Sequence, residues 1–389
     1  MKKVWILAAV FFLAACGGGS GGGGTSGGEA GDRASKPVKA FESGYDFFIV
    51  REANGTLYGW GKNDAGQLGR SGAGVPTNVP DPEMIPGVAN VVAVDAGYEH
   101  SLVLERDGKV YAFGSNSKGA LGTGDDQPRN GPVAVQNVPK AEDVAAGSWS
   151  SYIVTKDGDV YSFGDNRYGL LGRGPADSAA HPVPEKMVLP AKIVSVEAEG
   201  FSTVLIDENG DVYGLGYNGH RLMGQTDTGG GSAVKIPGLK HIVAAALGGT
   251  HALYLDRDGK VYGMGDSKSG QLGVSGAENN VTISVPLKIT GIPGIKMVSA
   301  YKNLSMLLDI DGHVWTCGAN YGGQLGLGYK GGQENTPKRV PALENIVLIH
   351  AENATAYAVD ANGTVYYWGN GSGGYDTPVV FSGIKVNVR

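Results

Sequence analysis

The side chains that most often carry out chemistry are few in this sequence and lie far apart along the chain. The seven histidines include no pair with the spacing of a metal site. They are His100, His181, His220, His241, His251, His313 and His350. No serine stands in the strand–turn–helix context that a G-x-S-x-G nucleophile requires, and no two carboxylates can be singled out as acid and base. The sequence therefore predicts a protein that is not an enzyme and that holds no metal and no cofactor.

Two further patterns suggest ligands, but both are better explained as loops. Gly214-x-Gly216-x-x-Gly219 and Gly326-x-Gly328-x-x-Gly331 match a dinucleotide-binding string, yet neither opens a helix that would face a pyrophosphate. Acidic strings at 207–211 and 309–312 are similar to fragments of a calcium loop, which stays open as an alternative, but they coincide with expected hairpin turns. Cys317 lies in an expected strand, where a buried and unreactive thiol is the default.

A repeat of about 51 residues organises the chain. A glycine that follows Asp or Asn recurs with separations of 53, 50, 52, 49, 53 and 51 residues. In each copy Leu or Val comes two positions later, then Tyr or Trp, and a second glycine comes six positions after the first. The first glycines of the seven copies are Gly55, Gly108, Gly158, Gly210, Gly259, Gly312 and Gly363. Seven copies of one unit indicate a repeat architecture and not a set of unrelated domains.

Each unit is expected to be a small sheet of three to four strands. The Asp-Gly and Asn-Gly pairs favour two-residue type I′ hairpin turns, and β-rich segments such as 101–105 and 109–113 flank them. One such sheet cannot bury both of its faces, whereas seven stacked radially can, so the fold class is all-β and the architecture a seven-bladed β-propeller. Segments 38–42 and 384–388 are similar, so we expect a strand from one terminus to complete a blade built from the other.

The repeat resembles that of the regulator of chromosome condensation family. The second copy carries the resemblance well, with Ala96-Gly97-Tyr98-Glu99-His100-Ser101, then Asp107-Gly108-Lys109-Val110-Tyr111 and Gly114. Gln-Leu-Gly endings recur at 67–69, 271–273 and 324–326, whereas the fourth copy departs from the pattern at Glu199 and Arg221. The resemblance covers the chain from about residue 37 to its end. It implies partner binding at one end of the ring, and its two precedents are guanine-nucleotide exchange on a small GTPase and inhibition of β-lactamases.

The N-terminus is similar to a bacterial lipoprotein signal peptide. Lys2 and Lys3 precede an apolar run at 4–13, and Leu13-Ala14-Ala15-Cys16 matches a lipobox, which implies cleavage after residue 15 and acylation of Cys16. A secretory signal with a chance cysteine is the alternative. Residues 16–36 are expected to be a lipidated cysteine and a Gly/Ser-rich tether, followed by the propeller at 37–389. This predicts a lipid anchor at the bacterial cell envelope, in the outer membrane if the host has two membranes.

The composition limits the class of partner. Glycine contributes 66 of 389 residues, which is typical of a turn-rich β protein here because hydrophobic residues still make up 41%. The formal net charge is -6, so no overall basic field draws the protein to nucleic acid. We expect a monomer that contacts the membrane only through its lipid and binds a protein or other macromolecule.

The candidate binding residues lie in the loops that follow Ala-Gly in each copy, because these positions differ between copies while the hairpin positions do not. Exposed aromatic residues within polar loops are typical anchors of a protein interface. The positions are Tyr45, Asp46, Tyr98, Glu99, His100, Trp149, Phe201, Thr250, His251, Lys302, Asn303 and Asn353. Packing of the aromatic side chains on neighbouring loops, or of His100 and His251 by hydrogen bonds, is the structural alternative.

The sequence therefore predicts a lipid-anchored, non-catalytic propeller that binds a macromolecule through one end of the ring. The rival is a carbohydrate-binding or enzymatic propeller that uses the central channel, and a purely structural envelope protein is a third hypothesis. Acidic side chains converging on the channel would favour the rival, whereas a channel lined by small residues would count against it. Exchange activity fits poorly with export, since a GTPase and its nucleotide are cytoplasmic.

Overall fold

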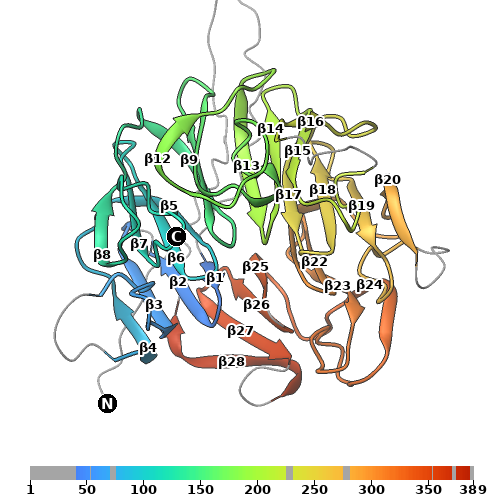
Figure 1. Ribbon diagram of the computed structural model, residues 1–389. Helices are drawn as coiled ribbons and strands as arrows, with labels where there is room; N and C mark the ends of the chain where they lie inside the picture. The colour runs from blue at the N-terminus through green and yellow to red at the C-terminus, as the bar shows by residue number, and fades with distance from the viewer. Residues whose placement is uncertain are drawn as a thin grey trace, which may run out of the picture.

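Seven four-stranded sheets surround a central space in the computed structural model (Figure 1). The structure describes residues 41–52, 54–70, 76–224, 231–274, 281–352, 354–369 and 374–385. Each sheet consists of four strands that are consecutive in the sequence, and neighbouring strands are antiparallel. The first strand of each sheet lies innermost, where it contacts the first strands of the adjacent sheets. The predicted all-β seven-bladed propeller is confirmed, with four strands in each blade.

The blades follow the repeat in chain order. Blade 1 contains β1 (Phe41–Gly44), β2 (Phe47–Arg51), β3 (Leu57–Lys62) and β4 (Asn78–Met84). Blade 2 contains β5 (Val91–Ala96), β6 (His100–Glu105), β7 (Val110–Gly114) and β8 (Arg129–Ala134). Blade 3 contains β9 (Ala141–Ala146), β10 (Ser150–Thr155), β11 (Val160–Asp165) and β12 (Ala180–Lys186), with the 3-10 turn η1 (Arg167–Gly169) between the last two. Blade 4 contains β13 (Ile193–Glu199), β14 (Ser202–Asp207), β15 (Val212–Gly216) and β16 (Val234–Lys235).

The remaining three blades have the same plan. Blade 5 contains β17 (Ile242–Leu247), β18 (His251–Asp256), β19 (Val261–Asp266) and β20 (Thr282–Lys288). Blade 6 contains β21 (Ile295–Tyr301), β22 (Leu304–Asp309), β23 (Val314–Ala319) and β24 (Gln333–Arg339). Blade 7 contains β25 (Ile346–Glu352), β26 (Thr355–Asp360), β27 (Thr364–Gly369) and β28 (Tyr375–Lys385).

The hairpin turns between the second and third strands differ from the prediction. In blade 2 the Gly108 amide donates to the Glu105 carbonyl at 2.9 Å, and the Glu105 amide donates to the Lys109 carbonyl at 2.9 Å, so the loop holds three residues. Gly108 has a φ of 89°, while Asp107 is not in the left-handed region. The predicted two-residue type I′ turn is therefore wrong. A type I′ turn needs a positive φ at both central residues, whereas this three-residue loop needs it only at glycine.

The second recurring glycine closes the third strand against a loop of the same blade. Gly114 has a φ of 109°, and a Cβ there would collide with the Glu99 carbonyl oxygen. That oxygen accepts a 2.8 Å hydrogen bond from the amide of Ser115. The equivalent glycines in the other blades are similarly close to the carbonyl oxygens of Asp46, Trp149, Phe201, Thr250, Asn303 and Ala354. A side chain would prevent this approach, which explains why the glycine recurs in every copy.

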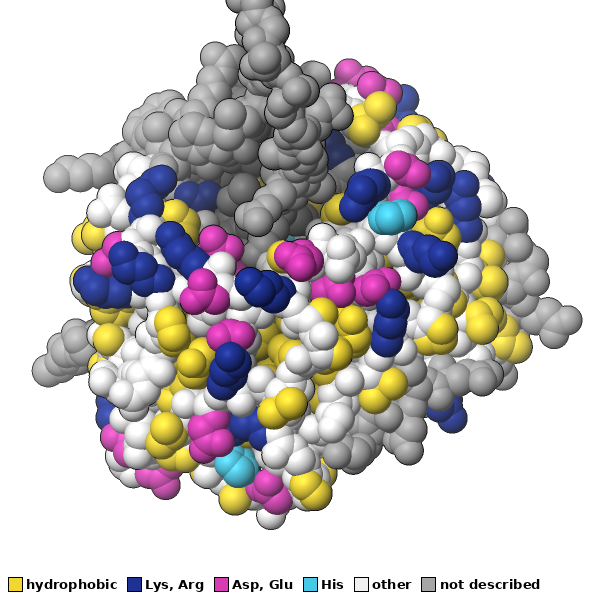
Figure 2. Space-filling view, turned by 90° about the horizontal axis from the view of Figure 1, so that it is seen from above, with side chains coloured by type: hydrophobic (Ala, Val, Ile, Leu, Met, Phe, Trp, Pro, Cys, Tyr) yellow, Lys and Arg dark blue, Asp and Glu magenta, His cyan; other side chains and the backbone are white. Residues whose placement is uncertain are grey.

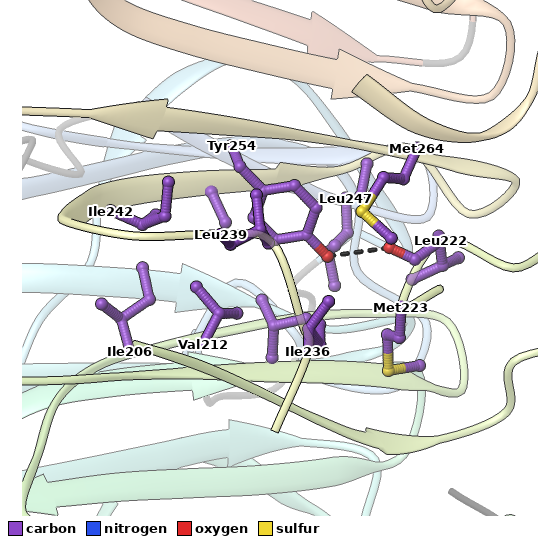
Figure 3. Close-up of a cluster of buried hydrophobic side chains, with 13 residues drawn as sticks. Ile206, Val212, Leu222, Met223, Ile236, Leu239, Ile242, Leu247, Tyr254 and Met264 are labelled. Carbon is purple, nitrogen blue, oxygen red and sulfur yellow. Dashed lines mark hydrogen bonds between the residues drawn. The ribbon is translucent and has the colours of Figure 1, made fainter. Parts of the chain in front are cut away.

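Seven clusters of buried hydrophobic side chains lie between consecutive blades. The cluster between blades 4 and 5, drawn in Figure 3, packs Ile206 and Val212 of one blade against Ile242 and Tyr254 of the next. The Tyr254 hydroxyl is buried there and donates to the Leu222 carbonyl at 2.8 Å. Each blade thus buries one face against its predecessor and one against its successor, and the ring has no single central core.

Histidine and serine of the A-G-x-x-H-S string also join adjacent blades. His100 Nε2 of blade 2 lies 3.0 Å from Ser151 Oγ of blade 3, and that hydroxyl donates to the Ala120 carbonyl of blade 2 at 2.7 Å. His251 and Ser305 repeat the contact between blades 5 and 6 at 2.7 Å. Burial lowers the pKa of both imidazoles to about 4, so they are neutral at physiological pH.

Closure of the ring also differs from the prediction. All seven described sheets are contiguous in the sequence, and 384–385 belongs to β28, the outer strand of blade 7, and not to a shared blade. The predicted exchange of a terminal strand is therefore wrong. Blades 1 and 7 instead meet through what we call the aromatic seam: Phe41, Phe48, Trp60, Tyr357 and Phe381. Trp60 stacks on Phe48 with ring centroids 5.1 Å apart, and Ser43 Oγ lies 2.6 Å from His350 Nε2 across the same junction.

The outer edges of the blades are protected against pairing with other chains. Proline occurs in six of the seven outermost strands, for example Pro80 in β4, Pro132 in β8 and Pro286 in β20, and the seventh strand, β16, has only two residues. Proline offers no amide hydrogen to an incoming strand.

The N-terminal predictions lie outside the described residues. These are the signal peptide at 1–15, acylated Cys16, the tether at 16–36 and the first residues of the expected propeller at 37–40. Among the residues that the structure describes, no helix has the length and hydropathy of a membrane span.

Candidate interaction surface at the loop end of the ring

Two sets of loops from every blade lie at the same end of the ring. The antiparallel order of each blade places the Ala-Gly loop, which joins its first two strands, beside the loop that joins its third and fourth strands. We call this end the loop end. The hairpin turns with the Asp-Gly and Asn-Gly pairs lie at the opposite end.

Main-chain hydrogen bonds link the Ala-Gly loops of blades 1 to 4 in series. The Tyr45 amide donates to the Tyr98 carbonyl at 3.1 Å, the Tyr98 amide to the Ser148 carbonyl at 3.2 Å, and the Ser148 amide to the Gly200 carbonyl at 3.0 Å. Each donor directly follows a glycine: Gly44, Gly97 and Gly147. A Cβ at Gly44 or Gly97 would collide with the carbonyl of the next loop, so glycine permits this close approach.

The aromatic side chains of these linked loops form a continuous row, which we call the aromatic arc. Tyr45 stacks on Tyr98 with centroids 4.5 Å apart, Tyr98 lies 5.3 Å from Trp149, and Trp149 lies 5.7 Å from Phe201. The arc continues through two tyrosines of the second loop set, with Phe201 5.4 Å from Tyr168 and Tyr168 5.1 Å from Tyr217. Tyr45, Tyr168 and Tyr217 are 43%, 45% and 39% exposed, so the row is accessible at both of its ends.

Two cations lie on the arc, and each is paired with a carboxylate. The Arg167 guanidinium lies 5.1 Å from the Trp149 ring and 5.0 Å from the Phe201 ring, while its Nε donates to Asp165 at 2.6 Å. The Lys62 ammonium lies 5.3 Å from the Tyr45 ring and pairs with Glu99 at 2.9 Å. Lys62 also pairs with Asp64 at 3.3 Å. The arc is therefore amphipathic, and its positive charges are neutralised locally.

The other predicted binding residues are distributed unevenly. Asp46 is exposed beside the arc, whereas Thr250, Lys302 and Asn303 lie at the loop end of blades 5 and 6. Thr250 donates to the Lys302 carbonyl at 3.2 Å, which is a side-chain link and not a main-chain one. Asn353 lies outside the described residues.

Two residues on the predicted list do not belong to the accessible surface. His100 and His251 are 1% and 0% exposed and form the contacts between blades described above. The prediction that they contact a partner is wrong, because burial within the ring leaves neither imidazole reachable, and the alternative of hydrogen bonding within the loops is the correct one.

Arg167, Tyr168 and Tyr217, which complete the arc, were not predicted from the sequence. All three lie in loops between third and fourth strands, at the positions after Asn166 and Gly216. The signal that would have found them is topological: in an antiparallel blade these loops emerge at the same end as the Ala-Gly loops.

Beside the arc, three larger side chains surround the loop end of the central channel. Glu199, Tyr301 and Glu352 occupy the position that is Gly44, Gly97, Gly147 or Gly248 in the other four blades. Burial, with the Asp95 carboxylate nearby, raises the pKa of Glu199 to about 7. Burial raises the pKa of Glu352 as well, opposed by a hydrogen bond from Ser43. Burial and the two glutamates raise the pKa of Tyr301.

The channel itself combines acidic and small side chains. The residues that line a cavity of about 160 Å³ include Glu42, Asp95, Glu197 and Glu199 and the alanines of β17. A second cavity of about 40 Å³ extends from Glu199 and Tyr301 towards Tyr45 and Tyr98. Both features that the sequence analysis set against each other, acidic convergence and a small-residue lining, are therefore present.

The remaining sequence patterns lie in the turns, strands and loops of the blades. Asp309 lies in a hairpin turn, where its carboxylate accepts from the amides of Asp311 at 3.0 Å and His313 at 2.8 Å and from the Trp315 indole at 2.9 Å. These bonds lower the pKa of Asp309 against the opposing effect of burial. Cys317 is a buried free thiol, and burial raises its pKa to about 12. The glycine-rich string at 214–219 covers the end of β15 and the loop after it, and the string at 326–331 lies in the loop between β23 and β24.

Charge on the described surface is mixed. Figure 2 shows lysine and arginine side chains interspersed with aspartate and glutamate over the face that it views. Several of the charged side chains form exposed pairs, such as Lys186 with Asp159 at 2.7 Å and Lys235 with Asp211 at 2.5 Å. Isolated exposed pairs contribute little to stability.

The fold and this surface define a repeat β-propeller with a row of aromatic side chains on the loops at one end. The chain belongs to the Regulator of chromosome condensation (RCC1) repeat family: the family model matches residues 54–104, 107–154, 157–206, 258–308 and 311–352. A second model of the same repeat matches 38–67, 91–120, 141–170 and 242–271. Neither model matches 207–241, the part of the fourth copy that contains Arg221.

Individual relatives agree with this assignment. The Regulator of chromosome condensation of Xenopus laevis is 29% identical over 346 residues, which cover 82% of this chain and 68% of that protein. The human protein of the same name is 30% identical, with 74% and 73% covered. The Ultraviolet-B receptor UVR8 of Arabidopsis thaliana is 26% identical, with 89% and 80% covered. The crystal structure of Prp20p from Saccharomyces cerevisiae has the same fold, with a TM-score of 0.74, 21% identity, and 90% of this chain and 88% of that chain covered.

Proposed function

We propose that this protein is a non-catalytic binding module that recognises a protein through the aromatic arc. The observation that carries the proposal is the arc itself: six aromatic side chains in successive contact, three of them well exposed. Aromatic and arginine side chains are enriched among the residues that dominate binding energy at protein interfaces. Main-chain links between the loops support the proposal further, because a surface ordered before binding loses little conformational entropy.

The proposal includes export and a lipid on Cys16, which places the propeller at the cell envelope. The chain enters the ring through β1, which runs from Phe41 towards Gly44 at the loop end. The tether therefore joins the propeller at the opposite end. With roughly 25 residues between Cys16 and Phe41, a flexible tether spans about 25–30 Å on average. The arc is then directed away from the anchoring membrane, where a partner has access.

A structural relative offers two partner classes by analogy. The structure of Prp20p is described together with binding to Gsp1p and histones. We do not extend either partner to this chain, because the predicted export separates it from cytoplasmic and nuclear proteins. Inhibition of a secreted enzyme, the other precedent of the family resemblance, is compatible with export and is one form of the proposed binding.

A carbohydrate-binding or enzymatic propeller is the second candidate. The observation that favours it is the group of acidic residues at the channel, Asp95, Glu197 and Glu199, with a pKa for Glu199 of about 7. The alanines of β17, the neighbour of the strand β13 that carries both glutamates, provide no polar groups to orient a sugar. We therefore rank this candidate below binding at the arc.

A pull-down from envelope and secreted fractions tests the proposal, with residues 37–389 as bait. A variant with Tyr45, Tyr98, Trp149 and Phe201 all changed to Ala is the comparison, and Tyr321→Ala is the control. Tyr321 is 70% exposed and lies in the loop between β23 and β24, at the same end of the ring but outside the arc. We expect the wild type and the control to enrich a protein that the folded quadruple variant loses. Equal capture by all three would contradict the proposal.

A further inference from the structure

The further inference rests on the proposed function and concerns the opening of the central channel beside the aromatic arc. We propose that this opening binds an arginine side chain of the partner protein, with Glu199 as its carboxylate partner. We call the opening the channel mouth: it is the cavity of about 40 Å³ between Tyr45 and Tyr98 of the arc and Glu199 and Tyr301. Because two residues of the arc also line the mouth, a partner seated on the arc can reach it.

The walls of the channel mouth give a side chain a path inwards. On the side of the arc the lining residues include four glycines, which have no side chain: Gly44, Gly97, Gly147 and Gly200. Main-chain hydrogen bonds between successive arc loops hold this wall in place. Glu199 and Tyr301 also line the larger cavity of about 160 Å³, so the two cavities meet at these residues. An ordered main-chain wall therefore leads from the arc to a carboxylate.

Carboxylates outnumber cations around the channel mouth. Glu199 is partly exposed, and its carboxylate interacts electrostatically with Asp95 and Lys302. The Glu352 carboxylate interacts with Glu199, Asp46 and Lys302. This group of described residues thus contains four carboxylates and one cation. An incoming cation is attracted to such a group, whereas an anion is repelled.

One hydrogen-bond acceptor in this group is buried and unsatisfied. Glu352 is 5% exposed, and among the described residues its Oε2 atom has no hydrogen-bond partner. Ser43 donates to the same carboxylate, and the Ser43 hydroxyl in turn lies 2.6 Å from His350 Nε2. Burial of a carboxylate oxygen without a donor costs free energy. A cation that carries several N–H groups would supply the donor that this oxygen lacks.

The guanidinium group of arginine fits this chemistry better than an ammonium group does. It stays charged over the physiological pH range, presents five N–H donors in one plane and is more weakly hydrated than an ammonium group. Several donors allow it to pair with Glu199 and still serve Glu352. The apolar stem of the side chain would pass the rings of Tyr45 and Tyr98 at the entrance.

A metal ion is a poorer occupant of the channel mouth. Among the described residues, one group of three brings its possible ligand atoms within 4.8 Å of one another, and it consists of Asp309, Asp311 and His313 in a hairpin turn of blade 6. The carboxylates of the mouth do not converge in this way. Their spacing suits a branched organic cation better than a metal ion, which needs its oxygen ligands close together.

Ionisation of the two glutamates links binding to pH. Burial and Asp95 raise the pKa of Glu199 to about 7, and burial raises the pKa of Glu352. Burial also raises the pKa of Tyr301 and lowers that of His350 to about 4, so both stay neutral between pH 6 and pH 8. The other charged groups here are Glu42, Asp46, Asp95, Glu197 and Lys302. Because a guanidinium pairs with the ionised carboxylate, its binding should strengthen about tenfold from pH 6 to pH 8.

The experiment measures the binding of the peptide acetyl-Gly-Arg-Gly-amide to the protein by saturation-transfer NMR. The same peptide with citrulline, which has the shape of arginine without its charge, is the comparison. At pH 8 we expect saturable binding of the arginine peptide and at least about tenfold weaker binding of the citrulline peptide. Lowering the pH to 6 should weaken the binding of the arginine peptide about tenfold.

Two variants assign the binding to the channel mouth. Glu199→Gln should weaken binding of the arginine peptide at least about tenfold and reduce its dependence on pH. Asp126→Asn is the control and should stay within about twofold, since Asp126 is an exposed carboxylate in the loop between β7 and β8, at the same end of the ring but outside the mouth. If Glu199→Gln does not fold, Glu352→Gln is the second variant.

Three results would overturn the inference. One is absence of saturable binding of the arginine peptide at concentrations up to about 10 mM. Another is equal binding of the citrulline peptide, or equal binding of the arginine peptide to Glu199→Gln. The third is tighter binding of acetyl-Gly-Lys-Gly-amide or of calcium ions that Glu199→Gln abolishes.

The pull-down separates this inference from the proposed function. A protein that Glu199→Gln captures as well as the wild type does, but that the quadruple arc variant loses, would leave the proposed function standing and remove this inference. Capture that the quadruple variant also retains would remove both.

Discussion

The ring contains two clusters of aromatic side chains that are similar in chemistry but differ in exposure to solvent. The aromatic seam between blades 1 and 7 contains Phe41, Trp60 and Tyr357, which are 4%, 8% and 9% exposed. The aromatic arc contains Tyr45, Tyr168 and Tyr217, which are 43%, 45% and 39% exposed. The seam lies between two sheets, whereas the arc lies on loops that nothing else in the described structure covers. The same side chains therefore stabilise the fold at one place and remain available for binding at the other.

The cause of the difference is the element that carries each group. Seam residues such as Phe41 and Trp60 lie on β1 and β3, whose side chains point into the space between blades. Arc residues such as Tyr98 and Trp149 lie on loops held in place by main-chain hydrogen bonds to the next blade. At the seam, burial of the aromatic side chains stabilises the folded state. At the arc, the loops are ordered while their side chains stay accessible, so binding a partner would cost little conformational entropy.

The largest expected effect is on stability at the seam. Trp60→Ala removes a ring that contacts Phe41, Phe48 and Phe381, so we expect a loss of about 3–5 kcal/mol in the free energy of unfolding. Chemical denaturation measures this loss. Partner binding per folded molecule should be unchanged. A loss of less than about 1 kcal/mol in the free energy of unfolding would show that the seam does not close the ring.

The next effect is on binding at the arc. Trp149→Ala removes the ring that connects Tyr98 to Phe201 and supports Arg167. We expect the affinity for the partner to fall by about 2 kcal/mol or more, roughly thirtyfold, while the free energy of unfolding changes by less than about 1 kcal/mol. Calorimetry of binding and denaturant melts measure the two quantities. The reverse pattern would assign Trp149 to packing, the alternative that the sequence left open.

Acid should destabilise the seam. Burial lowers the pKa of His350, beside Ser43 and Phe41, to about 4. In the unfolded chain the pKa of this histidine is about 6.5, so the unfolded state binds the proton at a higher pH than the folded state does. The free energy of unfolding therefore falls as the pH is lowered from about 6.5 to about 4. The expected contribution is on the order of 1–3 kcal/mol. His350→Gln should have a shallower stability–pH profile over this range, and an unchanged slope would contradict the assignment.

At the channel, a rise in pH and not a fall should reduce the stability contributed by a carboxylate, that of Glu199. Burial and Asp95 raise the pKa of Glu199 to about 7, so the folded protein holds that proton more tightly than the unfolded chain. The contribution of Glu199 to stability is therefore present below its unfolded pKa and is lost as the pH rises through about 7. Glu199→Gln should be more stable than the wild type at pH 8, as measured by thermal unfolding. Equal melting profiles at pH 8 would show that Glu199 is well solvated.

The smallest expected effect is at the exposed end of the arc. Tyr217 contacts Tyr168 on one side and His220 on the other, and it is 39% exposed. Tyr217→Ala is expected to weaken partner binding by about 0.5–1 kcal/mol, a factor of roughly two to five, because peripheral residues contribute less than central ones. The same titration as for Trp149→Ala measures it. An effect as large as that of Trp149→Ala would move the centre of the binding site towards blade 4.

Much of the fold could be predicted, because the recurring residues are required by the local backbone geometry of each blade. A glycine such as Gly108 is required at a positive φ in the hairpin, and one such as Gly114 is required where a strand touches a loop carbonyl. Both requirements act within one blade, so they recur in the sequence with the period of the blade. The detailed turn type was predicted wrongly, because an Asp-Gly pair fits two hairpin loops and only the hydrogen bonds distinguish them.

The candidate site was predicted only in part. Tyr45, Tyr98, Trp149 and Phe201 were found because the loop that carries them differs between copies of the repeat. Arg167, Tyr168 and Tyr217 were missed because they lie in a different loop from the predicted residues, and only the antiparallel blade brings the two loops together. His100 and His251 were placed on the surface because their burial depends on the serine of the next blade.

The sequence by itself determined the number of units, the small sheet of three to four strands in each, and the gathering of the variable loops at one end of the ring, since the repeat has a period of about 51 residues. Only the tertiary structure decided how the ring closes and which aromatic side chains meet. Both depend on distances between residues of different blades: Ser43 and His350 across the junction, and Tyr98 and Trp149 along the arc. A period in the sequence specifies the blade, whereas the packing of one blade on the next determines what the assembled ring buries and what it exposes.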